Sequence, residues 1–161
     1  MKTIALLFIL GFSVLLRLLP AQQLLTNPSF LDTNADGVPD GWLLTPAPDH
    51  VSTFLTVTNY GGTPCVRMVD QSTNWGLGLR QTLTVRPGTI FREVIRAQGG
   101  QLSIYYRWLD SSNALIEPVH SMMARGGSNT FLSNEFVSSA PTQAASLEVW
   151  VYSTMANQTT T

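Results

Sequence analysis

The sequence predicts an all-β protein that folds as an antiparallel β-sandwich, and two observations support this fold class. Apolar and polar side chains alternate along segment after segment, which is the period of two that places successive residues on opposite faces of a strand. The alternating segments are short and recur about every 8–12 residues, between turns rich in Gly, Pro and Asn. No segment shows the apolar stripe of an amphipathic helix.

Eight strands are expected, bounded by turn signals such as Asn-Tyr-Gly-Gly, Arg-Pro-Gly, Gln-Gly-Gly, Arg-Gly-Gly and Ala-Pro. In chain order they are Ser52–Thr58, Cys65–Val69, Leu79–Val85, Thr89–Ile95, Gln101–Trp108, Ala114–Val119, Asn129–Ser138 and Ser146–Tyr152. Alternation assigns faces most clearly in the fifth and the last of these. The expected inward residues are Leu102, Ile104, Tyr106, Trp108, Leu147, Val149 and Val151.

Residues 1–21 are expected to be a secretory signal peptide. A charged N-terminus precedes an apolar run from Ile4 to Leu16, and Ala21 offers a small residue at a cleavage point. A membrane anchor is the competing interpretation, but the run is shorter than the ~20 residues that a span needs, and Arg17 interrupts it. We therefore expect a secreted or periplasmic protein without stable membrane insertion, whose residues 22–161 form a single β-sandwich module.

The composition after the leader limits the classes of partner. Ten acidic residues and seven arginines follow Ala21, giving a formal charge of −3 with no lysine. A surface that neutralises phosphates needs clustered Lys and Arg, so we do not expect nucleic acid as a partner. Cys65 is the only cysteine, which excludes an intramolecular disulfide, and we expect it in the core as a small apolar residue.

The segment from Asp32 to Trp42 has the pattern of a calcium loop. Its candidate ligands are Asp32, Asn34, Asp36, the Val38 carbonyl and Asp40. Ca²⁺ takes 6–8 oxygen ligands, and side-chain oxygens at alternate positions of a turn aim at one point. Gly37 permits the sharp bend between them. The loop lacks the closing glutamate of an EF-hand, and a metal-free Asx–Gly turn is the alternative. We favour a structural calcium site.

Three short motifs lie at Leu25–Phe30, Asp36–Trp42 and Gln81–Gly88. Together they resemble the galactose-binding-like jelly rolls, which include carbohydrate-binding modules of secreted polysaccharide-degrading enzymes. The resemblance spans residues 24–153 and implies a jelly-roll sandwich, a structural calcium ion near the first strand and often sugar binding. Leu31 stands where the group usually has an acid. The group's closing strand is not evident after Tyr152, so we expect a jelly roll without it, from a truncated module or the front of a longer protein.

Sugar binding needs an aromatic ring for the C–H face of a pyranose and polar groups for its hydroxyls. If strands 101–108 and 146–152 share a sheet, their outward side chains form such a patch. The candidate ligand-binding residues are Trp150, Tyr152, Tyr105, Arg107 and Glu148, with Trp75 in a loop as a further candidate. Trp42 and Trp108 are expected in the core. The alternative is that the outward rings pack under a loop or against a neighbouring domain.

No catalytic residue is assigned. A glycosidase needs two carboxylates on either side of the scissile bond, and the acids outside the loop are scattered singly. His50 and His120 also stand apart, without the spacing of metal ligands. We expect a non-catalytic module that binds polysaccharide or oligosaccharide, with any catalytic domain outside this chain. The alternative is a structural or adhesive extracellular sandwich that contacts protein, and a small enzyme is the more distant one.

Overall fold

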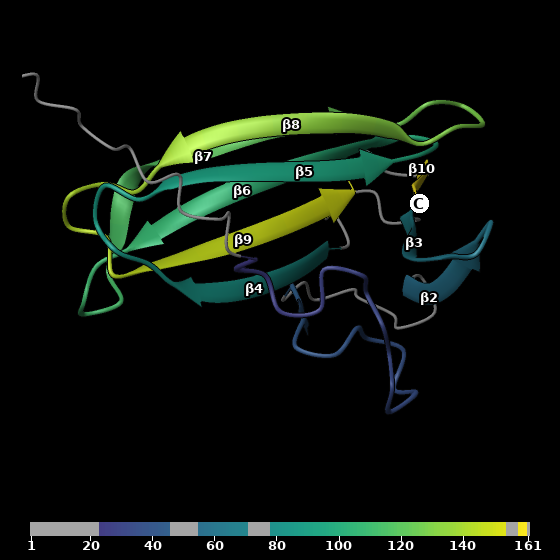
Figure 1. Ribbon diagram of the computed structural model, residues 1–161, viewed down its shortest axis with the longest axis horizontal. Helices are drawn as coiled ribbons and strands as arrows, with labels where there is room; N and C mark the ends of the chain where they lie inside the picture. The colour runs from purple at the N-terminus through teal and green to yellow at the C-terminus, as the bar shows by residue number, and fades with distance from the viewer. Residues whose placement is uncertain (1–22, 46–54, 71–77, 154–157, 161) are drawn as a thin grey trace, which may run out of the picture.

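The computed structural model describes residues 23–45, 55–70, 78–153 and 158–160, and this part of the chain contains ten strands and no helix (Figure 1). The strands are β1 (Leu43–Leu44), β2 (Leu55–Tyr60), β3 (Thr63–Asp70), β4 (Gly78–Thr84), β5 (Ile90–Ala97), β6 (Gln101–Leu109), β7 (Leu115–Arg125), β8 (Leu132–Ser139), β9 (Ser146–Ser153) and β10 (Gln158–Thr160).

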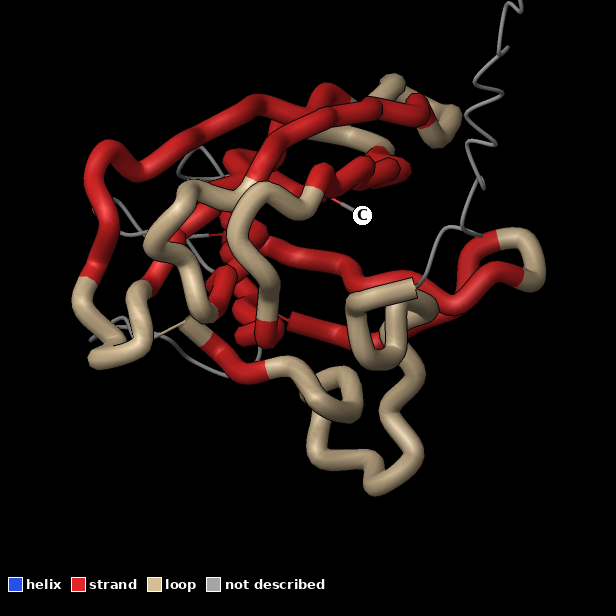
Figure 2. Tube along the Cα trace, turned by 60° about the vertical axis from the view of Figure 1, so that its left-hand side comes forward, coloured by secondary structure: helices blue, strands red, loops and turns tan. Residues whose placement is uncertain are grey.

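The strands form antiparallel sheets arranged in two layers. One layer is a five-stranded sheet in the order β1-β4-β9-β6-β7. The other layer is divided between the pair β5-β8 and the three-stranded sheet β10-β3-β2. In Figure 1, β5 and β8 lie at the top of the view and β2, β3 and β10 at its right-hand end. Figure 2 shows the layers connected by loops at their ends.

The core lies between the two layers. Phe91 of β5 contacts Trp108 of β6 across it, with ring centroids 5.6 Å apart, and Trp108 is 1% exposed. Val66 and Met68 of β3 are buried in the same apolar cluster. Burial of apolar surface between two sheets is the main contribution to the stability of such a fold. The predicted all-β sandwich is confirmed.

The faces assigned by alternation are confirmed in β6 and β9. Buried and half-buried residues alternate along both strands, and all the residues expected to point inward are buried. Trp42 and Cys65, expected in the core, are 4% and 7% exposed. Burial raises the pKa of the Cys65 thiol, and a backbone hydrogen bond opposes that shift. A residue in this environment behaves as a small apolar group.

Several strand bounds differ from the prediction, and β7 differs because pairing extends it beyond its clear alternation. β7 runs to Arg125 instead of ending at Val119, since its residues pair with β6 on both sides of an irregularity in register between Tyr106 and Trp108. The segment contains Pro118 and adjacent methionines, so its alternation is poor. β8 begins at Leu132, later than the predicted Asn129, and β1 was not predicted at all.

A strand also forms near the end of the sequence, where none was predicted. The residues of β10 pair with Met68–Asp70 of β3. This segment is polar and has no alternation, so only the neighbouring edge of β3 identifies it as a strand. The predicted strand from Ser52 is described from Leu55 onward, where it is confirmed.

A buried glutamine attaches the N-terminal segment to the five-stranded sheet. The Gln81 Oε1 atom accepts the Thr26 backbone N–H at 2.8 Å, and Gln81 Nε2 donates to the carbonyls of Thr26 and Gly41 at 3.0 and 2.9 Å. Trp42 packs on Phe30, with ring centroids 5.2 Å apart. Gln81 is 5% exposed, and these bonds satisfy its amide. The loop that carries the candidate calcium ligands is thereby held at both ends.

Two predictions lie outside the described residues: the signal peptide, within residues 1–22, and Trp75. Within the described ranges, no helix has the length and apolar character needed to cross a bilayer.

Candidate functional site

The side chains predicted for the ligand patch lie together on three neighbouring strands of the five-stranded sheet. Antiparallel register places Tyr105 of β6 and Arg80 of β4 on either side of Trp150 in β9. Arg107 of β6 lies opposite Glu148 of β9. We call this surface the aromatic face, and all its members are half-buried. It consists of Arg80, Tyr105, Arg107, Glu148, Trp150 and Tyr152.

Glu148 holds the polar groups of the aromatic face in place. Arg107 Nη1 donates to Glu148 Oε2 at 2.7 Å, and Trp150 Nε1 donates to the same oxygen at 3.1 Å. Arg80 Nη1 lies 3.8 Å from Glu148 Oε1. The Glu148 side chain is 13% exposed, so these contacts are partly shielded from water. One carboxylate therefore positions two arginines and an indole.

The rings of the aromatic face pack against one another and against the arginines. Trp150 and Tyr152 are stacked, with centroids 5.8 Å apart and an interplanar angle of 24°. Tyr105 meets Tyr152 edge to face at the same separation. The guanidinium of Arg107 lies 4.7 Å from the centre of the Trp150 ring and that of Arg80 lies 5.5 Å from it, both within cation–π range. These contacts restrict the rotamers of the rings before any ligand arrives.

Gly78 allows the Tyr152 ring to lie close to β4. A Cβ at Gly78 would stand 2.5 Å from the Val151 carbonyl oxygen and 3.1 Å from two atoms of the Tyr152 ring. Backbone cannot move away as a flexible side chain can, so only glycine fits at this position. The glycine therefore helps to set the position of Tyr152.

Arg80 and Gly78 are the residues of this surface that sequence reasoning missed. The alternation along the predicted strand 79–85 already placed Arg80 opposite the inward Leu79, so a signal was present. The missing information was the pairing of β4 with β9, which joins residues about seventy positions apart.

The candidate calcium loop brings some of its predicted ligands together. Asp32 Oδ1 and Asn34 Oδ1 both accept the backbone N–H of Asp36, at 3.3 and 3.0 Å. Asn34 Nδ2 donates to Asp36 Oδ2 at 3.0 Å. One carboxylate oxygen and one amide oxygen therefore converge on the backbone N–H of Asp36, and the Asp36 carboxylate adjoins the Asn34 amide.

The remaining predicted ligands are arranged differently. The Asp40 carboxylate accepts the Thr33 hydroxyl at 2.6 Å, and the Val38 backbone N–H donates to Asp36 Oδ1 at 2.9 Å. Bonds of this kind are typical of Asx turns. Across the part of the chain that the structure describes, no three His, Cys, Asp or Glu side chains are grouped as metal ligands.

No family model and no curated protein matches this sequence. Among solved structures, the fold is similar to the enzymatically active domain of tailspike protein 4 from bacteriophage CBA120, with a TM-score of 0.59 and 18% identity. That match covers 75% of this chain but 18% of the tailspike chain, so this chain spans less than a fifth of its length.

Two carbohydrate-binding modules match over nearly their whole length. A family 16 carbohydrate-binding module has a TM-score of 0.54 and 14% identity, covering 82% of this chain and 93% of that one. TmCBM61, solved with β-1,4-galactotriose, has a TM-score of 0.53 and 14% identity, covering 87% and 93%. The chain therefore has the β-sandwich fold of carbohydrate-binding modules.

Proposed function

We propose that this chain is a non-catalytic carbohydrate-binding module of a secreted protein and that the aromatic face binds polysaccharide. The observation that carries the proposal is the convergence of three aromatic rings, two arginines and one carboxylate from β4, β9 and β6. The fold shared with carbohydrate-binding modules supports the class of protein. The signal-peptide pattern of residues 1–21 supports secretion.

The chemistry of the aromatic face suits a sugar ring. The axial C–H groups of a pyranose present an apolar surface that stacks on an indole or phenol ring. Arg107 and Glu148 supply hydrogen-bond donors and acceptors beside Trp150 for the hydroxyls around the sugar's edge. Because these groups already hold one another, binding would order few additional rotamers.

The same surface offers little for catalysis. Glycoside hydrolysis needs two carboxylates about 5–9.5 Å apart across the scissile bond. The aromatic face holds one carboxylate, Glu148, and that group is engaged by two arginines and Trp150. We infer an accessory role, in which this module holds a larger polysaccharide-acting protein on its substrate.

The test is retention on insoluble polysaccharides, with Trp150→Ala as the principal variant. Truncation of a central interface aromatic costs about 2 kcal/mol or more, which is roughly thirtyfold in affinity. We expect Trp150→Ala to lose retention and Tyr105→Ala to weaken it. Tyr60→Ala is the matched control, because Tyr60 is 49% exposed on β2, outside the aromatic face.

Two outcomes would count against the proposal. Loss of retention in Trp75→Ala but not in Trp150→Ala would move the site to Trp75. If the intact chain retains no glycan on any support, sugar binding is wrong.

A protein-contacting module is the second candidate function, and the exposed face of β5-β8 favours it. Ile90, Val94 and Val137 are 74%, 51% and 64% exposed there. Val137 lies opposite Arg92, which stands between Ile90 and Val94 in β5. Exposed apolar side chains that share one face of a sheet are typical of interaction surfaces. A glycan array separates the two candidates, because a purely protein-binding module should retain no sugar.

We also propose that the loop from Asp32 to Asp40 binds a structural calcium ion. The converging oxygens of Asp32 and Asn34, with Asp36 beside them, support the site. Asp40 would have to turn from Thr33 to join them. Such an ion would supply charge neutralisation and would order the loop.

Calcium should raise the melting temperature of the protein if this loop binds it. Stabilisation by mass action is about 2.7 kcal/mol at a hundredfold excess of ligand over Kd. Asp36→Ala should remove the difference between calcium and chelator. Asp110→Ala is a matched control, because Asp110 accepts the backbone N–H groups of Ser112 and Ala114 in a similar turn elsewhere. Identical melting curves in calcium and chelator would contradict the site.

A further inference from the structure

The central strands of the five-stranded sheet carry an excess of positive charge. The charged residues of β4, β9 and β6 are Arg80, Glu148 and Arg107, so two positive charges and one negative charge leave a formal charge of +1. The acid and the arginine of β7, Glu117 and Arg125, cancel each other. The chain after the leader has a formal charge of −3. The aromatic face is therefore opposite in sign to the protein that carries it.

The two arginines of the aromatic face pair with Glu148 to different extents. Arg107 donates to Glu148 Oε2 at 2.7 Å, which is a charge-assisted hydrogen bond. Arg80 Nη1 lies 3.8 Å from Glu148 Oε1, which is too long for a hydrogen bond. The Nε atom of Arg80 is buried and has no hydrogen-bond partner within the described part of the chain. Arg80 is therefore the less fully paired of the two arginines.

A ligand on this surface can reach both guanidinium groups. The side chains of Arg80 and Arg107 are 31% and 32% exposed, whereas that of Glu148 is 13% exposed. The same guanidinium groups lie within cation–π range of the Trp150 ring. A substituent at the edge of a sugar ring stacked on Trp150 would therefore meet an arginine.

These contacts specify the chemistry of a matching sugar. Its ring needs an apolar side for Trp150, and its edge needs a negative charge for Arg80. A carboxylate suits the planar guanidinium, which offers paired N–H donors in a fixed geometry. Uronic acids combine the two features, because a carboxylate replaces the hydroxymethyl group at the edge of the pyranose ring.

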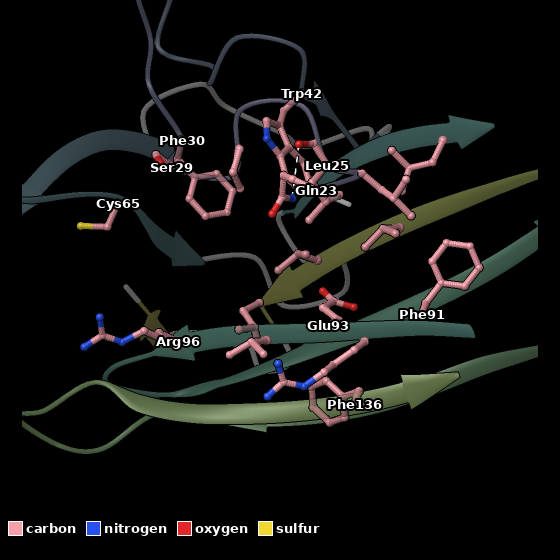
Figure 3. A pocket seen from close by; sticks show the side chains of 18 of the residues that line it. Gln23, Leu25, Ser29, Phe30, Trp42, Cys65, Phe91, Glu93, Arg96 and Phe136 are labelled. Atoms are coloured by element: carbon pink, nitrogen blue, oxygen red, sulfur yellow. Dashed lines mark hydrogen bonds between the residues drawn. The ribbon is translucent and has the colours of Figure 1, made fainter. Parts of the chain in front are cut away.

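The cleft on the opposite side of this sheet is less suited to an anion. It lies between the two layers, has a volume of about 930 Å³ and is lined mostly by apolar and aromatic side chains. Figure 3 shows Glu93 projecting into the cleft from β5 and Arg96 directed away from Glu93. The Glu93 carboxyl accepts the Tyr106 hydroxyl, and its ionised form would repel a uronate. Arg92, which also lines the cleft, is paired with Glu135 at 2.7 and 2.8 Å.

We propose that the aromatic face binds an acidic polysaccharide that contains uronic acids, with a sugar stacked on Trp150 and its carboxylate paired with Arg80. This inference rests on the proposed sugar-binding function and names the class of sugar. Glu148 holds Arg107 and Trp150 in place, so the ligand meets groups that are already ordered. The net negative charge of the whole chain opposes an acidic ligand only weakly, because physiological salt screens interactions beyond about 8 Å.

The test compares acidic oligosaccharides with neutral partners that have the same backbone. Oligosaccharides of galacturonic acid and of mannuronic acid supply two arrangements of the hydroxyls, and reduction of their carboxyl groups to alcohols gives the neutral partners. Titration calorimetry with the intact chain should show that at least one acidic form binds roughly tenfold or more tightly than its partner. This ratio corresponds to the gain from one hydrogen bond to a charged group.

Arg80 is the residue whose replacement should change this preference. Arg80→Gln keeps an N–H donor but removes the charge, so most of the preference for the acidic form should be lost. Arg80→Lys keeps the charge without the planar pair of donors and should retain part of the preference. Arg92→Gln is the matched control, because Arg92 is paired with Glu135 in the other layer, and it should keep the full preference. Melting temperatures establish that each variant is folded.

Salt supplies a second readout that needs no variant. Raising the NaCl concentration from about 0.05 M to about 0.5 M should weaken binding of the acidic oligosaccharide, because salt screens charge pairs at a surface. Binding of the reduced partner should change little over the same range. A preference that is independent of salt would contradict a charge pair with Arg80.

Other results would also overturn the proposal. One is binding of the reduced form that equals or exceeds binding of the acidic form, which would leave a sugar-binding module without a preference for acids. Full preference in Arg80→Gln would place the carboxylate elsewhere. Competition by poly-L-glutamate at equal carboxylate concentration would mean that the surface recognises carboxylates without a sugar ring.

Failure of this inference can be distinguished from failure of the proposed function. A chain that binds neither form but is retained on a neutral polysaccharide would contradict the acidic sugar alone. A chain that binds neither form and is retained on no polysaccharide would contradict sugar binding itself.

Discussion

Replacement of Glu93 by glutamine should change how the stability of this protein depends on pH. Glu93 lies in the cleft between the layers, where burial raises its pKa from 4.5 to about 7. In the unfolded chain the carboxyl is solvated and titrates near its ordinary value. Between these two pKa values the folded protein therefore holds a proton that the unfolded chain releases.

The sign follows from proton linkage. Because the folded state binds more protons, the free energy of unfolding falls as pH rises from 4.5 through 7. The stabilisation contributed by protonated Glu93 is complete at pH values below the pKa of this group in the unfolded chain. It is absent at pH values above its pKa in the folded protein. A pKa difference of this size corresponds to about 3 kcal/mol across the window. Glutamine keeps an oxygen that can accept the Tyr106 hydroxyl but has no proton to lose.

Urea denaturation followed by tryptophan fluorescence, from pH 4.5 to 8.5, measures the effect. Wild type should lose stability over this range, whereas Glu93→Gln should lose much less and should be the more stable protein at pH 8. Glu117→Gln is the matched control, because Glu117 is an exposed acid on β7. A wild-type stability that stays constant from pH 5 to 8, or an unchanged slope in Glu93→Gln, would refute the reasoning.

Two further predictions concern packing. Trp108→Ala should lower the free energy of unfolding by about 3–5 kcal/mol, because it is a large-to-small change in the core. Tyr105→Ala, on the half-buried outer face, should lower it clearly less. The opposite ranking would mean that the two faces of β6 are exchanged. Gly78→Ala should lower the melting temperature and also weaken polysaccharide retention, because the added methyl group collides with the Val151 carbonyl and the Tyr152 ring. Unchanged melting and retention would show that β4 can yield at this point.

Much of the candidate site could be predicted from local pattern. Alternation alone separated Tyr105 and Trp150 from the core residues Tyr106 and Trp108, since the side chains of a strand point to opposite faces in turn. The same rule does not say which strands are neighbours. Arg80 was therefore missed, although its face was readable, until the pairing of β4 with β9 placed it beside Trp150.

The environment of Glu93 could not be predicted for a similar reason. Its position within a short strand is local information, but its burial depends on the distant strand β6, whose Tyr106 hydroxyl donates to the Glu93 carboxylate. Two segments with weak alternation, β10 and the second half of β7, are likewise identified as strands only by their pairing with β3 and β6.

The sequence by itself determined that this protein is all-β, which residues of its clearest strands point inward, and that aromatic and charged side chains share the outer faces of β6 and β9. These properties follow from the period of two, which depends on nothing beyond the chain's own backbone geometry. Only the tertiary structure decided the strand order, the charge cluster around Glu148 and the cleft beside β5. Each of these depends on hydrogen bonds and contacts between residues far apart in the chain, and no local pattern encodes which distant segments meet.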